Sequence, residues 1–213
     1  MLNRLLLAAC LGLGILGVNS PVRAQADPAS LPAHDTHQGV TVAVKPLMTE
    51  AAYKTQFGSG HTPYEAGILA LEVFFRNDND KPIRLKLDTM RLLVNLAGQS
   101  PQRIDPLSPE EVADRVLFKT PSSPRASRLP VPGRVPPSNR DKNWQEFDKR
   151  LQGAALPSDV VGPKATVHGF LYFDVNHHYD WLTGARLDVP DVAFMLNNEA
   201  LFFFQVDLAP ALH

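Results

Sequence analysis

Strict alternation of apolar and polar side chains is the feature that most narrows the folds open to this chain. Leu69, Leu71, Val73 and Phe75 occupy every second position of one segment, and residues 83–87 repeat the pattern. Because successive side chains of a strand point to opposite faces, this spacing predicts half-buried β-strands. Similar segments cover residues 40–45, 90–96, 167–175, 185–189, 192–196 and 201–208. Their short separations favour antiparallel pairing.

Three short helices are predicted between these strands. Thr49 can cap the first helix, which ends at Gly58, and Ser108 with Glu111 forms a capping-box pattern at the start of the second. The third helix covers residues 143–151 and places large apolar side chains at helical spacing: Trp144, Phe147 and Leu151. Together these elements predict a mainly β fold, a β-sandwich with short helical insertions.

The first 26 residues have the layout of a secretory signal peptide. Arg4 precedes an apolar run over residues 5–18, and two small-x-small cleavage sites end at Ala24 and Ala26. The run is shorter than the roughly 20 apolar residues of a membrane span. We therefore expect no membrane span and a protein that is exported, periplasmic or secreted, after cleavage at one of these sites.

Cys10 offers an alternative fate for the amino terminus. Residues 7–10 fit a lipobox, which would leave a lipid anchor on Cys10 in the cell envelope. An apolar stretch follows Cys10 where a lipoprotein has a polar tether, so we favour cleavage without an anchor. A G-x-G-x-x-G match at residues 12–17 is rejected as a dinucleotide motif, because that motif requires a strand before it and a helix after it.

Charge and cysteine content exclude several classes of function. Removal of the signal would take two of the 21 basic residues and none of the 22 acidic ones, which changes the formal net charge from −1 to −3. A nucleic-acid partner, which needs a basic face, is not expected. Cys10 is the one cysteine of the sequence, so the mature chain would have no disulfide and no thiol nucleophile. No pattern in the sequence indicates a cofactor.

The mature chain is predicted to hold one domain over residues 39–213, preceded by a flexible leader at residues 27–38. Six prolines fall between positions 121 and 137, with no apolar period among them. Proline restricts the backbone to extended forms and donates no ladder hydrogen bond, so a long exposed loop is predicted at about residues 119–139. Its basic residues are Arg125, Arg128 and Arg134.

Two stretches of the chain carry a resemblance to known domains. A long strand pattern over residues 68–77 ends in asparagine, and Pro82 and Ile83 open the next strand after a turn. Residues 167–174 combine a glycine with aromatic residues. These features resemble the telokin-like, immunoglobulin-like domains of bacterial exported proteins and lipoproteins of unknown function. The resemblance covers roughly residues 41–98 and 156–208, and the proline-rich segment departs from it. It implies an immunoglobulin-like antiparallel β-sandwich in the envelope, and it transfers no catalytic residue.

Histidines beside carboxylates are the candidate metal ligands. His177, His178 and Asp180 fall in a predicted loop that could turn both imidazoles inward, with Asp174 as a further ligand. The alternative to a metal site is an ordinary solvent-exposed loop between strands. A second group lies in the predicted leader: His34, Asp35 and His37. An alternative function as a periplasmic metal-binding protein would depend on His177 and His178.

Carboxylates on strands and loops are the candidates for acid–base catalysis. Asp174, Asp180, Asp188 and Glu72 could pair as glycosidase carboxylates do, although such residues are ordinary on the wet faces of strands. No G-x-S-x-G motif marks a serine nucleophile. A carboxylate-dependent hydrolase is therefore a second alternative, and no catalytic residue is assigned.

Aromatic strand residues are the candidate partner-binding site. Phe170 and Tyr172 share a face of their strand, and an exposed aromatic face of this kind marks a docking surface. In the competing prediction, Trp144 and Phe147 cover this face within the monomer. With Phe170, Tyr172 and Trp144 as its candidate contacts, we expect an exported, noncatalytic envelope module that binds an envelope protein partner or scaffolds.

Overall fold

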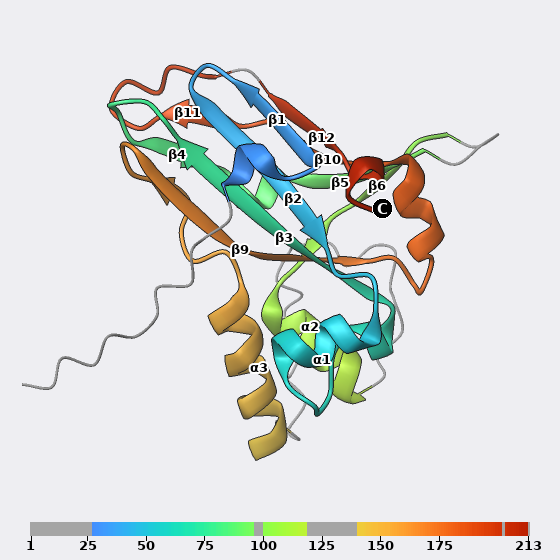
Figure 1. Ribbon diagram of the computed structural model, residues 1–213. Helices are drawn as coiled ribbons and strands as arrows, with labels where there is room; N and C mark the ends of the chain where they lie inside the picture. Colours follow the sequence, from blue (N-terminus) through green and yellow to red (C-terminus); the bar gives the residue numbers. More distant parts are fainter. Residues whose placement is uncertain (1–26, 96–99, 119–139, 202, 213) are drawn as a thin grey trace, which may run out of the picture.

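The computed structural model describes residues 27–95, 100–118, 140–201 and 203–212. The predicted signal peptide, with Cys10, and the predicted proline-rich loop at residues 119–139 lie outside the described residues. Antiparallel sheets form the main body of the protein, and the three α-helices gather at one end of them (Figure 1). The prediction of a mainly antiparallel β protein with short helices is confirmed.

A five-stranded antiparallel sheet is the larger layer of the fold. Its order is β1-β2-β3-β9-β7, and its centre is the pairing of β3 with β9 over ten residues of each strand. The predicted alternating segment at residues 68–75 lies in β3, which is buried over most of its length. The strands are β1 Ala33–His37, β2 Val40–Pro46, β3 Ile68–Asn77, β9 Ala165–Asp174 and β7 Pro106–Leu107.

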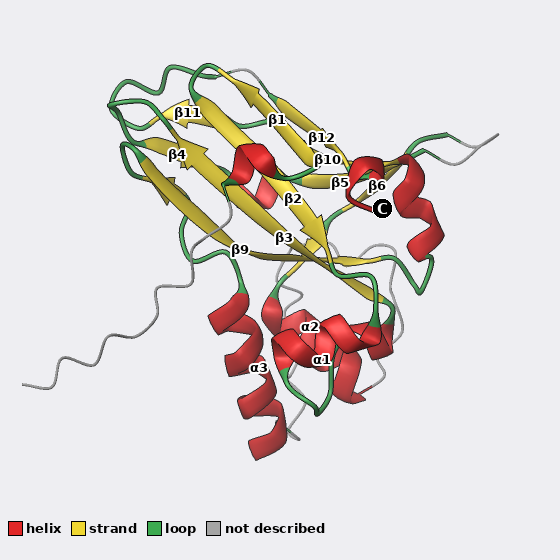
Figure 2. Ribbon diagram, viewed as in Figure 1, coloured by secondary structure: helices red, strands yellow, loops and turns green. Residues whose placement is uncertain are grey.

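Two smaller antiparallel sheets form the opposite layer. The four-stranded sheet has the order β12-β10-β5-β6, and the three-stranded sheet has the order β11-β4-β8. Figure 2 shows their strands behind and beside the larger sheet. Their strands are β12 Phe204–Asp207, β10 Ala185–Val189, β5 Arg91–Val94 and β6 Gln102–Ile104, then β11 Val192–Phe194, β4 Ile83–Leu85 and β8 Val160–Val161.

Two continuous segments of the chain each contribute one strand to both small sheets. Both segments are interrupted between the two sheets, side by side. β4 continues into β5 through the 3-10 helix Leu87–Thr89, while β10 continues into β11 through Pro190 and Asp191. β4 pairs with β11, and β5 pairs with β10. Between the two ladders the Lys86 amide still donates to the Asp191 carbonyl at 3.2 Å. Proline has no amide hydrogen, so the ladder breaks where Pro190 enters it.

The main hydrophobic core lies between the two layers. Alternate residues of the large sheet, such as Val42, Leu71 and Phe173, belong to one buried cluster with Leu92 and Phe204 of the small sheets. This is the burial that the period-two patterns predicted, because one face of each strand turns inward.

The predicted flexible leader is wrong for residues 33–37, which form strand β1. β1 pairs with β2 over five residue pairs, from Ala33 with Val44 to His37 with Val40. The turn between them contains Gln38 and Gly39, whose φ angles are 51° and 71°. Two successive residues with positive φ are typical of the two-residue hairpin turn that suits twisted strands. The polar composition of β1 hid this edge strand, because only Ala33 is buried.

Three helices cover the outer face of β3 and β9 and form a second core. They are α1 Glu50–Phe57, α2 Pro109–Phe118 and α3 Lys142–Ala154. The predicted caps are confirmed: the Thr49 hydroxyl accepts from the Ala52 amide, and Ser108 and Glu111 make the reciprocal capping-box bonds. The second core contains Tyr53, Phe57, Val112, Trp144, Phe147, Leu151, Phe170 and Tyr172, among others.

Candidate functional site

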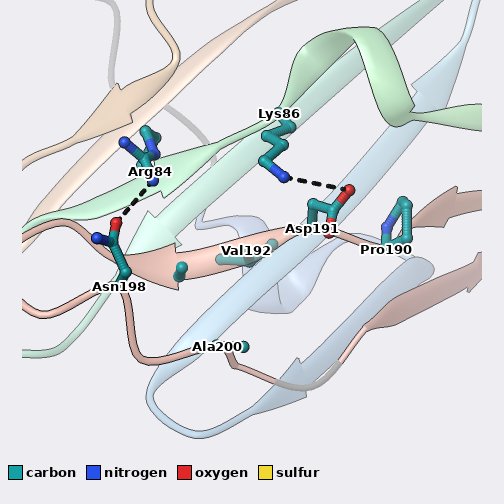
Figure 3. A pocket seen from close by; sticks show the side chains of 8 residues that line it. Arg84, Lys86, Pro190, Asp191, Val192, Asn198 and Ala200 are labelled. Atoms are coloured by element: carbon teal, nitrogen blue, oxygen red, sulfur yellow. Dashed lines mark hydrogen bonds and ion pairs between the residues drawn. The ribbon is translucent and has the colours of Figure 1, made fainter.

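A hollow of about 300 Å³ lies on the three-stranded sheet, beside the interruption between the two small sheets. Figure 3 shows its lining side chains, which come from β4 and the residue after it, from the connector between β10 and β11, from the start of β11 and from the turn after β11. They are Arg84, Lys86, Pro190, Asp191, Val192, Ala193, Asn198 and Ala200. We treat this hollow as the candidate functional site.

The strand geometry explains why charged side chains line the hollow. Ile83 and Leu85 of β4 are buried in the main core. Arg84 alternates with them and points to the outer face, and Lys86 continues the same row. Ala193 of β11 lies opposite Arg84 in the ladder, and Ala200 forms a single bridge to Ala193. Two methyl side chains in adjacent positions leave the space that the longer Arg84 and Lys86 chains surround.

Arg84 and Lys86 give the hollow two cationic groups. The Arg84 Nη2 donates to Asn198 Oδ1 at 2.8 Å, which uses one of the five N–H donors of the guanidinium. The Lys86 Nζ lies 3.9 Å from Asp191 Oδ2, and both side chains are about half exposed. An ion pair that is this long and this exposed contributes little free energy. Both cations are therefore accessible to an anionic ligand.

The turn after β11 holds Asn198 in place beside Arg84. The Asn198 amide donates to the Phe194 carbonyl at 3.0 Å, and the Phe194 amide donates to the Glu199 carbonyl at 2.9 Å. The Met195 amide donates to the Pro82 carbonyl at 2.9 Å, which ties this turn to the turn before β4. Asn198 has a φ of 54°, a conformation that asparagine tolerates better than most residues.

The tip of the same turn is apolar and exposed. Met195 is 47% exposed and Leu196 is 76% exposed, so a large part of each side chain faces solvent. Most large apolar side chains of the described chain are buried in the two cores. Met195 and Leu196 do not line the hollow, but the turn that carries them also carries the lining residue Asn198.

The structure does not assemble the metal site predicted at His177, His178 and Asp180. His178 Nδ1 lies 3.8 Å from Asp180 Oδ1, while the His178 ring stacks on Trp181 at a centroid distance of 4.4 Å. His177 has a φ of 66°, and its amide donates to the Gly67 carbonyl. Across the described ranges no group of three or more His, Cys, Asp or Glu residues could hold a metal ion.

Asp35 and His37 of β1 connect the edges of the two layers. The Asp35 carboxylate accepts from the Gln205 amide at 3.1 Å, and His37 stacks on Phe204 at 4.0 Å. His34 contacts the Leu31 carbonyl at 2.7 Å. The Asp35 and His37 contacts fix β1 beside β12, whereas the His34 contact is local, and none of the three residues is arranged around a common metal position.

The candidate catalytic carboxylates each have a separate partner. Asp174, at the end of β9, pairs with Arg115 of α2. Glu72 of β3 lies 3.3 Å from His168 Nδ1, and Asp188 of β10 accepts from Gln205 Nε2 at 3.2 Å. Asp180 lies near His178, as described above. The structure therefore places these four carboxylates on four different elements, each beside a different partner.

The predicted docking surface at Phe170, Tyr172 and Trp144 is wrong, because these side chains are inside the protein. Phe170 is 4% exposed, Tyr172 is 1% exposed and Trp144 is 7% exposed. The Tyr172 hydroxyl donates to the Leu151 carbonyl of α3 at 3.1 Å, and the Phe170 ring packs edge-on against Phe57 of α1. The competing prediction, that the Trp144 helix covers this face, is the one that the structure shows.

Sequence reasoning missed the hollow at Arg84. The alternation at residues 83–87 already placed Arg84 and Lys86 on the wet face of a strand. The missing information was the pairing of β4 with β11, which brings residues 190–200 beside them. Local sequence patterns do not indicate which distant segments of the chain pair with each other.

In the part of the chain that the structure describes, no helix has the length and apolar character needed to cross a membrane. No protein-family model matches this sequence. No curated protein matches it either. Among solved structures the chain is similar to a functionally unknown protein from Listeria monocytogenes EGD-e. The match has 12% sequence identity and a TM-score of 0.33, and it covers 74% of this chain and 68% of that chain.

Proposed function

We propose that this protein is an exported, noncatalytic module of the cell envelope that binds a partner through an anionic group. The observation that carries the proposal is the hollow at Arg84 and Lys86, where two accessible cations lie over a floor of alanine methyl groups. Guanidinium and ammonium groups bind carboxylates and phosphates by charge-assisted hydrogen bonds, which are stronger than neutral ones.

The backbone around the hollow favours binding over chemistry. Arg84 and Lys86 lie on or next to a paired strand, and the Asn198 turn is held by several backbone hydrogen bonds. A site on paired strands is pre-organised, so little conformational entropy is lost when a ligand binds. The lining side chains supply N–H donors and one carboxylate, which suits recognition of charge.

We propose that the two layers form an immunoglobulin-like sandwich in which the β4–β5 and β10–β11 segments are interrupted strands of one layer. The shared core between the layers supports this view. Such sandwiches commonly carry binding sites on strand faces and on end loops. A solved structure in which the layers cross near 90° would contradict it.

Binding of small anions tests the function directly. Acetate and inorganic phosphate would be titrated into isotope-labelled protein while the amide signals of residues 84–86, 191–193 and 198–200 are followed by NMR. We expect saturable shifts confined to these residues, and we expect Arg84→Ala with Lys86→Ala to abolish them. Arg186→Ala serves as the matched control, because Arg186 is an exposed arginine on β10 of the other small sheet. Shifts that are absent, or that survive the double substitution, would refute the proposal.

Location is tested separately by the intact mass of the protein that the cell accumulates. A mass that begins at Gln25 or Asp27 supports export with signal cleavage. A mass that begins at Cys10 with an attached diacylglycerol would make the protein a lipid-anchored one and would overturn this part of the proposal. A mass that includes Met1 would argue against export.

A further inference from the structure

The charge of the hollow indicates what kind of anion it takes. Arg84 and Lys86 carry two positive charges, and Asp191 carries one negative charge at the rim. The net charge of one matches a carboxylate, which carries a single negative charge. A phosphate monoester carries about −1.5 to −2 near neutral pH, and its second charge would be repelled by Asp191.

The hydrogen-bonding groups indicate what lies next to the carboxylate. The Arg84 guanidinium is a planar fork that can bind both oxygens of one carboxylate. The Asp191 carboxylate and the Asn198 carbonyl oxygen can each accept an N–H, although Asn198 already accepts from Arg84. A ligand with a carboxylate and a nearby N–H donor satisfies this set. The last residue of a peptide chain has both groups, separated by a single Cα.

The apolar turn indicates what side chain the ligand carries. Met195 and Leu196 are exposed at the tip of the turn that also carries Asn198, and Ala193 and Ala200 form an apolar floor. The other charged groups around this turn have partners: Lys81 lies over the Phe194 ring at 5.4 Å, and Glu199 Oε2 accepts from Asn197 Nδ2 at 3.0 Å. An apolar side chain of the ligand would remove the methionine and leucine surfaces from water.

From these three observations we infer that the hollow binds the free C-terminal carboxylate of a peptide chain whose last residue is apolar. Arg84 and Lys86 hold the carboxylate, Asp191 accepts the backbone N–H of that residue, and Met195 and Leu196 contact its side chain. The inference rests on the proposed function, because it names the ligand class of the same anion-binding hollow.

The test compares two peptides that differ in the terminal group alone. A fluorescent tetrapeptide that ends in leucine as the free acid would be titrated against the full chain in the form that the cell accumulates, with its C-terminal amide as the matched probe. Hydrogen bonds to charged groups are worth about 1.5–3 kcal/mol, so the acid is expected to bind roughly tenfold to a hundredfold more tightly. Equal binding of acid and amide would refute the inference.

Substitutions assign the roles of the residues. Arg84→Ala should remove the preference for the acid, whereas Arg186→Ala should keep it. Leu196→Ser should weaken binding of the leucine-terminated acid and leave a glycine-terminated acid unaffected, and Phe203→Ser is the control, since Phe203 is 57% exposed and lies just before β12. Asp191→Ala should weaken the peptide acid while strengthening inorganic phosphate. Unfolding temperatures of all variants confirm that each is folded.

The binding results distinguish a failure of the peptide inference from a failure of the anion-binding function. If acetate and phosphate bind at Arg84 but the peptide acid shows no advantage over its amide, the anion-binding function stands and the peptide inference fails. If inorganic phosphate displaces the peptide at a lower concentration than acetate, the ligand is a phosphate compound and the inference fails. If no anion binds at Arg84 and Lys86, both proposals fail.

Discussion

Replacing Asp148 with asparagine tests how the helices pack, and it is expected to stabilise the protein at neutral pH. Asp148 of α3 is 8% exposed, and one of its oxygens accepts from Gln152 Nε2 at 2.6 Å. Its other oxygen, Oδ1, has no hydrogen-bond partner. The charged groups that face it are Glu110 and Asp114 of α2, with Arg140 beside them. A buried carboxylate oxygen without a partner is costly because it has lost its water.

The surroundings of Asp148 determine the sign of its pH dependence. Burial, followed by the negative charge of Glu110, raises the pKa of Asp148 above its ordinary value, and Arg140 and Gln152 oppose this only in part. The folded protein therefore binds the Asp148 proton more tightly than the unfolded chain does. The resulting stabilisation is fully present below the ordinary carboxyl pKa of about 3.9, and it is lost as pH rises through the raised pKa.

The magnitude follows from the missing hydrogen bond. An unsatisfied buried polar group costs about 1–3 kcal/mol and more when it is charged, and asparagine replaces the unpartnered anionic oxygen by a neutral amide nitrogen while keeping an acceptor for Gln152. Allowing for a weaker bond to Gln152, we expect Asp148→Asn to gain about 1 kcal/mol at neutral pH. For a chain of this length that gain raises the melting temperature by roughly 2–4 °C. The advantage should shrink as the pH falls through the raised pKa of Asp148, where the folded wild-type protein takes up its proton.

The assay is thermal unfolding followed by circular dichroism at several pH values. Glu146→Gln is the matched control on the same helix, because Glu146 is 62% exposed and pairs loosely with Lys142 at 3.6 Å. The control should change stability by less than about 0.5 kcal/mol. If Asp148→Asn lowers the melting temperature at neutral pH, or if its effect is the same at every pH, then the account of Asp148 as an uncompensated buried charge is wrong.

Two further substitutions test the packing around β9 and β3. Gly169→Ala should destabilise the protein by about 1–3 kcal/mol, because an added Cβ would lie 2.4 Å from Leu156 Cα, and urea unfolding of this variant should show a lower midpoint than Gly153→Ala, where nothing lies within 4 Å. Tyr53→Phe should cost about 1–3 kcal/mol, because the Tyr53 hydroxyl accepts from the Ala70 amide at 2.8 Å and donates to the Ile68 carbonyl at 2.9 Å. An unchanged hydrogen-exchange rate at the Ala70 amide would contradict that assignment.

Periodicity predicted the strands well wherever one face is buried and the other is wet. The alternation at Ile83 and Leu85 is an example, because both side chains enter the main core while Arg84 points outward. The same logic found the short helices, since capping residues such as Thr49 act on the local backbone. These features depend on neighbours along the chain, and so the sequence displays them directly.

Periodicity failed where tertiary contacts decide. The strand at residues 165–174 has apolar residues on both faces. The neighbouring sequence does not indicate which element packs over Phe170 and Tyr172. Strand β1 has polar side chains throughout its exposed face and was predicted to be flexible. The Arg84 hollow depends on the pairing of β4 with β11, which periodicity does not specify. In each case the deciding partner is distant in the sequence.

The interruption between β4 and β5, and between β10 and β11, lies beside the hollow and outside the paired strands that bury the core. The shape of the hollow can therefore change without a change in the core. The residues in the break, Leu87–Thr89 on one side and Pro190 with Asp191 on the other, connect two ladders that are each complete on their own. A change of length or composition in either connector would alter the mouth of the hollow, while the buried pairs on both sides keep their register. Related chains can therefore acquire different ligands through substitutions or length changes in two short connectors. The residues of the flanking strands, which determine the fold, need not change.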